Sequence, residues 1–197
     1  MMSCGLQPRC AGITSRTRGL RIVAIFTLLI AAFTSAGAFA NDPCLKMVFG
    51  RYCLGGDVGP LLQAVPPPLV RQEQDASLAL VFVDGPDRLY VLAFNGKIYK
   101  VVLAFGVSTQ LRYEETYAAL RDIYGSGEDR SRFSPDATTP GRRLVAIRRG
   151  EGVAMHVWTP SPAWRIELSW TREMGLALAY VATEINAARA AQIDRGL

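Results

Sequence analysis

The chain has 197 residues, a formal net charge of +5 and a hydrophobic fraction of 50%. Four of its 22 basic residues but none of its 17 acidic residues precede residue 41, which leaves 18 basic against 17 acidic residues, a net charge of +1. A nearly neutral body gives no electrostatic support for nucleic acid as a partner. Residues 41–197 are enough for a single domain with its own core.

The N-terminal part of the chain is typical of an export signal. Basic residues are followed by an uncharged apolar run over residues 22–40, which ends in the small-residue tripeptide Ala-Phe-Ala at 38–40. We therefore predict a signal peptide over residues 1–40 and a periplasmic or secreted chain from Asn41. In the alternative, residues 22–40 stay attached as a single-pass inner-membrane anchor, because their length is at the lower limit of a spanning helix. Residues 22–40 would then be the chain's one contact with a membrane.

Cys44 and Cys53 are the cysteines that follow the expected cleavage site. Their spacing is not the C-x-x-C of a redox motif, and with the single histidine of the chain they fall short of the four ligands of a zinc site. Residues 41–43 separate Cys44 from the small-residue run, which argues against lipid attachment. In an oxidising compartment we predict a disulfide. Closing a loop of about ten residues stabilises a fold by about 2.5–3 kcal/mol.

Three consecutive prolines, Pro66, Pro67 and Pro68, indicate an extended segment on the surface, because proline fixes φ and lacks a backbone donor. A spacer is the favoured interpretation, and a ligand for a proline-binding groove is the alternative. We expect residues 41–76 to form a disulfide-stapled segment followed by a Pro-rich linker, and residues 77–197 to form the main domain.

Three β-rich segments follow the linker. Residues 77–83, 88–94 and 97–105 are rich in branched and aromatic side chains. Asn95-Gly96 separates the second from the third and suits a type I′ turn, in which both central residues have positive φ. The pattern predicts an antiparallel meander.

One amphipathic helix is predicted over residues 109–124, because aromatic and apolar residues recur at helical spacing. Ser108 or Thr109 provides the N-cap and Gly125 the stop. The tyrosines on its apolar face, Tyr113 and Tyr117 among them, are expected to pack on the sheet. The alternative is that they line a ligand groove.

The remaining chain contains a loop, strands and a second helix. Residues 125–142 form a long polar loop, which is either mobile or functional. The strand predicted over residues 164–170 alternates apolar residues with Arg165, Glu167 and Ser169, so one of its faces is expected to be exposed. A helix is predicted over 183–196. The predicted strands cover residues 143–149, 153–159, 164–170 and 176–182.

These elements predict an α+β fold. We expect a two-layer antiparallel sheet of six or seven strands, with one central amphipathic helix and a C-terminal helix. The sequence has no internal repeat, and no motif is specific enough to indicate a family.

His156 is the only histidine of the chain and a weak candidate for a catalytic base. Catalysis would need a nucleophile such as Ser169 and a carboxylate such as Glu167 beside it on neighbouring strands. The nucleophile motifs G-x-S-x-G and S-x-x-K are absent. The sequence therefore predicts no catalytic set, no metal site and no cofactor.

An arginine cluster is the strongest candidate for a binding surface. Guanidinium groups suit carboxylate and phosphate groups, so the cluster favours an anionic component of the cell envelope or an acidic protein. Interspersed acidic residues make a solvated, mixed-charge face the alternative. The members are Arg130, Arg132, Arg142, Arg143, Arg148 and Arg149.

Together the observations favour an exported, non-catalytic domain that binds or scaffolds an envelope component. Two alternatives are a small periplasmic hydrolase or transferase that uses His156, and a membrane-tethered structural protein.

Overall fold

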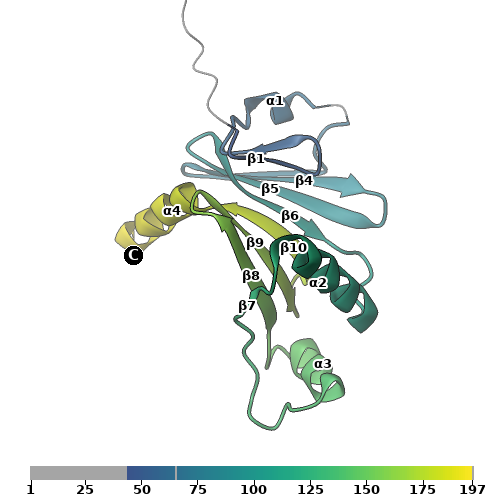
Figure 1. Ribbon diagram of the computed structural model, residues 1–197. Helices are drawn as coiled ribbons and strands as arrows, with labels where there is room; N and C mark the ends of the chain where they lie inside the picture. The colour runs from purple at the N-terminus through teal and green to yellow at the C-terminus, as the bar shows by residue number, and fades with distance from the viewer. Residues whose placement is uncertain (1–43, 65, 197) are drawn as a thin grey trace, which may run out of the picture. The chain divides into compact units, whose positions relative to one another are not determined.

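A computed structural model describes residues 44–64 and 66–196 (Figure 1). The predicted signal peptide, its cleavage site and the alternative anchor lie outside these residues. Within them, no helix is long and apolar enough to cross a membrane.

Eight antiparallel strands form one sheet, in the order β3-β4-β5-β6-β10-β9-β8-β7. The α+β prediction is confirmed: the sheet is antiparallel, a central helix and a C-terminal helix are present, and a small hairpin, β1–β2, is added. The strands are β1 (Lys46–Val48), β2 (Tyr52–Leu54), β3 (Val70–Gln74), β4 (Ser77–Asp84), β5 (Asp87–Phe94), β6 (Lys97–Ala104), β7 (Glu128–Asp129), β8 (Ala154–Ser161), β9 (Trp164–Thr171) and β10 (Gly175–Ala182). The helices are α1 (Gly59–Leu62), α2 (Gln110–Tyr124), α3 (Pro140–Arg149) and α4 (Thr183–Gly196).

From each edge of the sheet toward its centre, four strands follow one another in the order in which they occur in the chain. β3-β4-β5-β6 is followed in the chain by α2, and β7-β8-β9-β10 is followed by α4. The two halves meet where β6 pairs with β10, from Ala177 opposite Ala104 to Val181 opposite Lys100. The topology therefore repeats, although the amino-acid sequence does not, because a strand pattern needs only alternating apolar residues.

The turn between β5 and β6 agrees with the sequence. Asn95 has a φ of 50° and Gly96 a φ of 76°. Positive φ at both positions is what a type I′ turn requires, and its twist matches that of the flanking strands.

The main core lies on one face of the sheet. Leu80 is opposite Val91, and Val91 is opposite Val101 in the register, and all three are fully buried. The β1–β2 hairpin covers this face over the first half, where the ring of Tyr52 lies 6.2 Å from that of Phe82. Figure 1 shows the hairpin beside β4–β6 and α2 beside β9.

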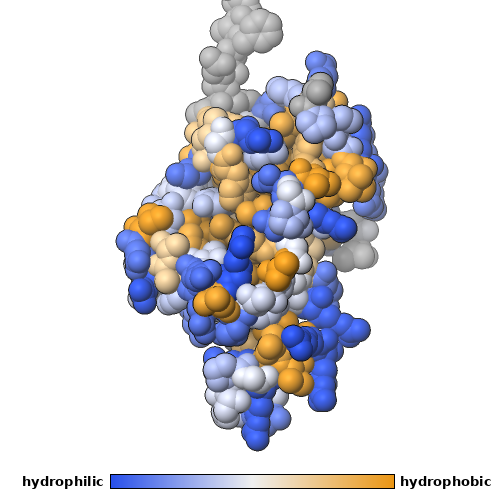
Figure 2. Space-filling model, turned by 90° about the vertical axis from the view of Figure 1, so that its right-hand side faces the viewer, coloured by the Kyte–Doolittle hydropathy of each residue, from blue (hydrophilic) through white to orange (hydrophobic). Residues whose placement is uncertain are grey.

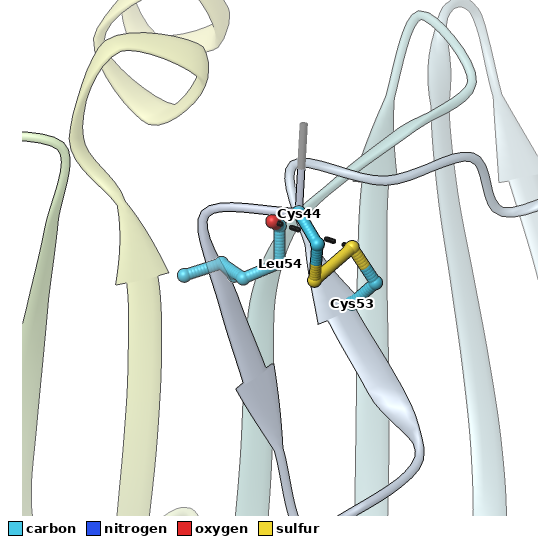
Figure 3. The surroundings of a disulfide bond; sticks show 3 residues. All are labelled: Cys44, Cys53 and Leu54. Atoms are coloured by element: carbon cyan, nitrogen blue, oxygen red, sulfur yellow. Dashed lines mark hydrogen bonds between the residues drawn. A yellow bond between two sulfur atoms is a disulfide. The ribbon is translucent and has the colours of Figure 1, made fainter. Parts of the chain in front are cut away.

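A disulfide joins Cys44 to Cys53, as the spacing predicts (Figure 3). The two Cα atoms are 5.3 Å apart, a usual separation for this bond. Leu45 donates its backbone N–H to Leu54 at 2.9 Å, which closes the base of the hairpin. Val48 on the same hairpin is buried in the core, so the staple fixes an element that packs on the sheet.

The prediction of a strand over residues 143–149 is wrong, because these residues belong to α3. Thr139 is the N-cap, and its side chain accepts the backbone N–H of Arg142 at 3.3 Å. Pro140 occupies the first turn, where no backbone donor is needed. Gly150 has a left-handed φ of 78° and stops the helix. The cap signals outweigh the branched residues that suggested a strand.

Two segments that were predicted to be irregular contain strands. β3 lies in the expected linker and pairs with β4, from Val70 opposite Val81 to Gln74 opposite Ser77. β7 lies in the expected polar loop and pairs with β8. The expected boundary at residue 76 falls in the turn between β3 and β4.

Candidate functional site

A cavity of about 120 Å³ lies between α2, β7, α3, β8 and β9. We call it the α2–α3 pocket. The expected polar loop contributes to its wall, because β7 and the residues that follow it line the cavity. The lining residues that carry ionisable or aromatic groups are Tyr113, Asp129, Phe133, Arg143, His156 and Trp170.

Strand register brings the first ionisable groups together. Asp129 of β7 is directly opposite His156 of β8. Alternate residues of a strand project from the same face, so His156 shares its face with Ala154 and Trp158. α2 covers this face, and Thr109 caps it by accepting the backbone N–H of Arg112 at 3.1 Å. The predicted helix start is thereby confirmed.

Aromatic rings surround the histidine. The ring of Tyr117 lies 4.6 Å from that of His156, and the ring of Trp158 lies 6.1 Å from it. Tyr113 contacts Trp170 at 6.1 Å between ring centroids. The tyrosines of α2 thus pack on the sheet, as predicted, and Tyr113 also lines the pocket, as the alternative proposed.

Tyr113 and His156 share a hydrogen bond of 2.8 Å between Oη and Nδ1. Burial lowers the pKa of His156 below its ordinary value, and Asp129 only partly opposes this effect. Burial, with the nearby Asp129, raises the pKa of Tyr113 to about 12. Both side chains are therefore neutral at pH 7.

Asp129 and Arg143 supply the charges of the pocket. Oδ1 of Asp129 accepts the backbone N–H of Ser131 at 2.9 Å, and hydrogen bonding from Ser131 is the main cause that lowers the pKa of Asp129. Nε of Arg143 donates to the carbonyl of Ala137 at 3.2 Å, and its guanidinium lies 5.2 Å from the ring centroid of Phe133. Among the described residues, no carboxylate lies within 4.0 Å of Arg143.

The catalytic partners considered from the sequence lie on the other face of the sheet. His156 is opposite Leu168, so Glu167 and Ser169 project away from it. Glu167 is only 7% exposed and accepts hydrogen bonds of 2.8 Å from both Lys100 and Arg165. The expected wet face of β9 therefore buries its carboxylate.

Burial by itself would raise the pKa of Glu167, but Lys100 and Arg165 together more than offset this effect and lower it.

Among the described residues that line the pocket, Ser131 has the hydroxyl that could act as a nucleophile, but this hydroxyl is already hydrogen-bonded to the backbone. Its Oγ accepts the backbone N–H of Met155 at 3.0 Å and donates to the carbonyl of the same residue. The hydrogen-bond partner of His156 is Tyr113. No described group of three or more His, Cys, Asp or Glu side chains is arranged to hold a metal ion.

The predicted arginine cluster lies mainly on α3. Arg130 pairs with Glu128 at 2.7 Å. No carboxylate of the described residues lies within 4.0 Å of the other five. Figure 2 shows hydrophilic residues around an apolar area at the lower end of the molecule, where Figure 1 shows α3. We call these five residues the α3 arginine surface: Arg132, Arg142, Arg143, Arg148 and Arg149.

Sequence reasoning missed Asp129 and Phe133 as parts of the site. Both lie in the segment that was interpreted only as a long polar loop. Phe133 is its one aromatic residue, and an apolar ring in a polar segment is a signal that the segment packs on something.

No protein-family model matches the chain, and no curated protein is similar to it in sequence. Solved structures resemble it, among them the following two. One is a cysteine-rich secretory protein from Staphylococcus aureus subsp. aureus Mu50, with 13% identity over 74% of this chain and 48% of that chain, at a TM-score of 0.41. The other is an extracellular protein containing a SCP domain from Bacillus anthracis str. Ames, with 10% identity over 66% of this chain and 44% of that chain, at a TM-score of 0.38. The chain thus spans about half the length of each, and a likeness at this level does not bear on what it does.

Proposed function

We propose that this chain is an exported domain that binds an envelope component through the α3 arginine surface, without catalysing a reaction. The observation that carries the proposal is the gathering of five arginines with no described carboxylate within 4.0 Å. Guanidinium forks match carboxylate and phosphate groups, so the partner carries anionic groups.

The packing of α3 leaves these arginines available. Only Ala146 and Ile147 of the helix are buried. A second cavity, of about 270 Å³, lies between α3 and the segment that precedes it, and its charged lining residues are Arg142, Arg149, Asp136 and Glu151. An arginine that forms no ion pair within the chain does not have to break one when it binds a partner. Binding therefore costs these side chains little free energy.

The pocket beside α3 supports binding more than catalysis. A phenol with a pKa of about 12 is a poor nucleophile at pH 7. A histidine whose pKa is lowered by burial remains a base, but the hydroxyl of Ser131 is already bonded to the backbone of Met155.

The test reverses the charge of arginines that do not line the α2–α3 pocket. Arg142→Glu with Arg149→Glu is compared with Arg71→Glu with Arg195→Glu, which changes the charge equally on exposed arginines elsewhere. Retention of the purified chain on washed envelope is measured at low and physiological salt, with circular dichroism as the check on folding. We expect the α3 variant to lose retention at least tenfold and the control to keep it. Equal retention by both variants would remove the arginine surface from the account.

A hydrolase or transferase is the second candidate function. The hydrogen bond of Tyr113 to His156, with Asp129 opposite His156 in the register, is the observation that favours it. Activity toward simple ester and phosphoester substrates is measured for the wild type and for His156→Ala. Turnover that disappears in a folded His156→Ala variant would contradict the non-catalytic proposal.

A further inference from the structure

Two opposite charges line the α2–α3 pocket without pairing with each other. Asp129 and Arg143 are close enough for Arg143 to help lower the pKa of the Asp129 carboxyl. They nevertheless form no ion pair within 4.0 Å. An exposed Asp and Arg gain little from pairing, so modest local contacts are enough to decide whether they meet. Their separation has such a cause.

The cause is that each charge is anchored on its own side. The backbone N–H of Ser131 holds the Asp129 carboxylate at 2.9 Å. The carbonyl of Ala137 accepts from Nε of Arg143, and the Phe133 ring lies under the guanidinium. These contacts use one carboxylate oxygen and one guanidinium nitrogen. The two terminal nitrogens of Arg143 are left for a ligand, and the Asp129 carboxylate keeps lone pairs that can accept from one.

The rest of the pocket is uncharged. Leu144 and Ile147 of α3 and Trp170 of β9 supply apolar walls. His156 and Tyr113 are neutral at pH 7 and satisfy each other with their hydrogen bond. The pocket therefore offers one anionic group, one cationic group and an apolar space.

The volume limits the size of an occupant. A cavity of about 150 Å³ holds benzene, which has six non-hydrogen atoms, so a cavity of about 120 Å³ encloses a group of roughly that size or smaller. A free amino acid with a small apolar side chain, such as alanine with about six non-hydrogen atoms, is of this size, and a longer side chain has to extend beyond the enclosed space. A dipeptide or a sugar chain is larger.

We propose that the α2–α3 pocket binds a free α-amino acid with an apolar side chain. The carboxylate of the ligand meets the terminal nitrogens of Arg143, and its ammonium group meets Asp129. Its side chain lies against Ile147 and Trp170. The inference rests on the proposed function, because it takes the pocket to be a binding site and not a catalytic one.

A ligand with a single charge fits less well. A ligand with only a carboxylate is attracted by Arg143 but repelled by Asp129. A ligand with only an ammonium group is attracted by Asp129 but repelled by Arg143. An aromatic cage for a cation is also disfavoured, since Arg143 already occupies the face of the Phe133 ring. A zwitterion satisfies both groups and carries no net charge into the apolar space.

The test uses matched ligands on the wild-type chain by isothermal titration calorimetry. The probes are L-alanine, L-valine, L-leucine and L-phenylalanine, with 4-methylpentanoate and 3-methylbutylamine as leucine analogues that lack one charge. We expect one of the amino acids to bind at least tenfold more tightly than either single-charge analogue. The NMR resonances of His156, the only histidine of the chain, should shift during the same titration.

Two conservative variants assign the roles. Asp129→Asn should weaken binding of the amino acid and strengthen binding of 4-methylpentanoate, because it removes the repulsion. Arg143→Gln should weaken binding of both. Arg132→Gln, which removes a charge that does not line the pocket, should change neither.

Binding of 4-methylpentanoate as tight as that of leucine would overturn the inference. So would the absence of both heat and His156 shifts with every probe. Neither result affects the envelope test, because Arg142 and Arg149 do not line the α2–α3 pocket. Failure of the inference and failure of the proposed function are therefore separable.

Discussion

The two halves of the sheet have the same strand order but different covers. Over the first half, β3 to β6, the disulfide-stapled hairpin packs through buried residues such as Val48, Tyr52 and Leu54. Over the second half, β7 to β10, α2 and α3 leave a cavity that contains a histidine, a tyrosine and two opposite charges. The two halves of the sheet thus have the same strand arrangement. The elements that pack on them determine whether the covered face is filled with apolar side chains or contains a pocket with ionisable groups.

The cavities of the two halves differ in the same way. A groove of about 340 Å³ beside the hairpin is lined mostly by apolar side chains, among them Leu61, Leu69 and Phe82. The α2–α3 pocket is smaller and holds groups whose pKa values are shifted. Shifted pKa values often accompany functional sites, and these three groups lie in the pocket proposed to bind a ligand.

The largest expected effect tests whether the halves share one core. Leu80 of the first half and Leu168 of the second are fully buried in the same cluster. Leu80→Ala and Leu168→Ala should each lower the free energy of unfolding by about 2–5 kcal/mol. Chemical denaturation followed by fluorescence and by circular dichroism should give one coincident transition for each variant. Two separate transitions would mean that the halves unfold independently.

The disulfide should stabilise the first half without shaping the pocket. Replacing Cys44 and Cys53 together by serine should cost about 2.5–3 kcal/mol, because the unfolded chain gains freedom. The NMR titration of His156 should stay unchanged, because neither cysteine lines the pocket. A changed His156 titration in a folded variant would contradict the separation of roles.

Glu167 should matter for stability and not for binding. Glu167→Gln removes the negative charge that strengthens the hydrogen bonds from Lys100 and Arg165, and should cost on the order of 2 kcal/mol at pH 7. The pKa of Glu167 is lower in the folded chain, so its stabilisation is complete above the ordinary pKa of 4.5 and is lost as pH falls through the folded pKa. The variant should therefore lose less stability than the wild type on acidification. Parallel profiles from pH 6 to 3 would contradict this account.

The smallest expected effect concerns the hydrogen bond in the pocket. Tyr113→Phe should lower stability by about 1 kcal/mol. It should also raise the pKa of His156, because we expect the phenol to donate to Nδ1 and so to favour the neutral ring. NMR titration of the variant measures the change. A lower His156 pKa in the variant would mean that the ring donates instead.

Much of the fold could be predicted from local patterns. The meander, α2, α4 and the disulfide follow from alternation, helical periodicity, cap residues and cysteine spacing, all of which act between near neighbours in sequence. The branched Val145 and Ile147 favour a strand over residues 143–149, but Thr139-Pro140 and Gly150 are start and stop signals of a helix, and the segment forms α3. β3 and β7 were missed because they are short or exposed, and pairing with distant partners stabilises them.

The candidate site was less predictable than the fold. The arginines and His156 were visible as residue types, but the pairing of β7 with β8 decides that Asp129 faces His156. The same register decides that Glu167 faces away from it. A shift of one residue would reverse both assignments, and no local pattern fixes a register between strands so far apart in the chain.

The pKa of His156 is the most direct test of whether the second half of the sheet holds a desolvated pocket, on which the proposed ligand site depends. It is measured by following the ring protons of this single histidine by NMR from pH 4 to 8 in the wild-type chain. The account predicts a pKa below the ordinary value of 6.5, because burial disfavours the imidazolium more than Asp129 favours it. A pKa above 6.5 would mean that Asp129 stabilises a charged ring more than burial disfavours it, and would contradict a desolvated pocket.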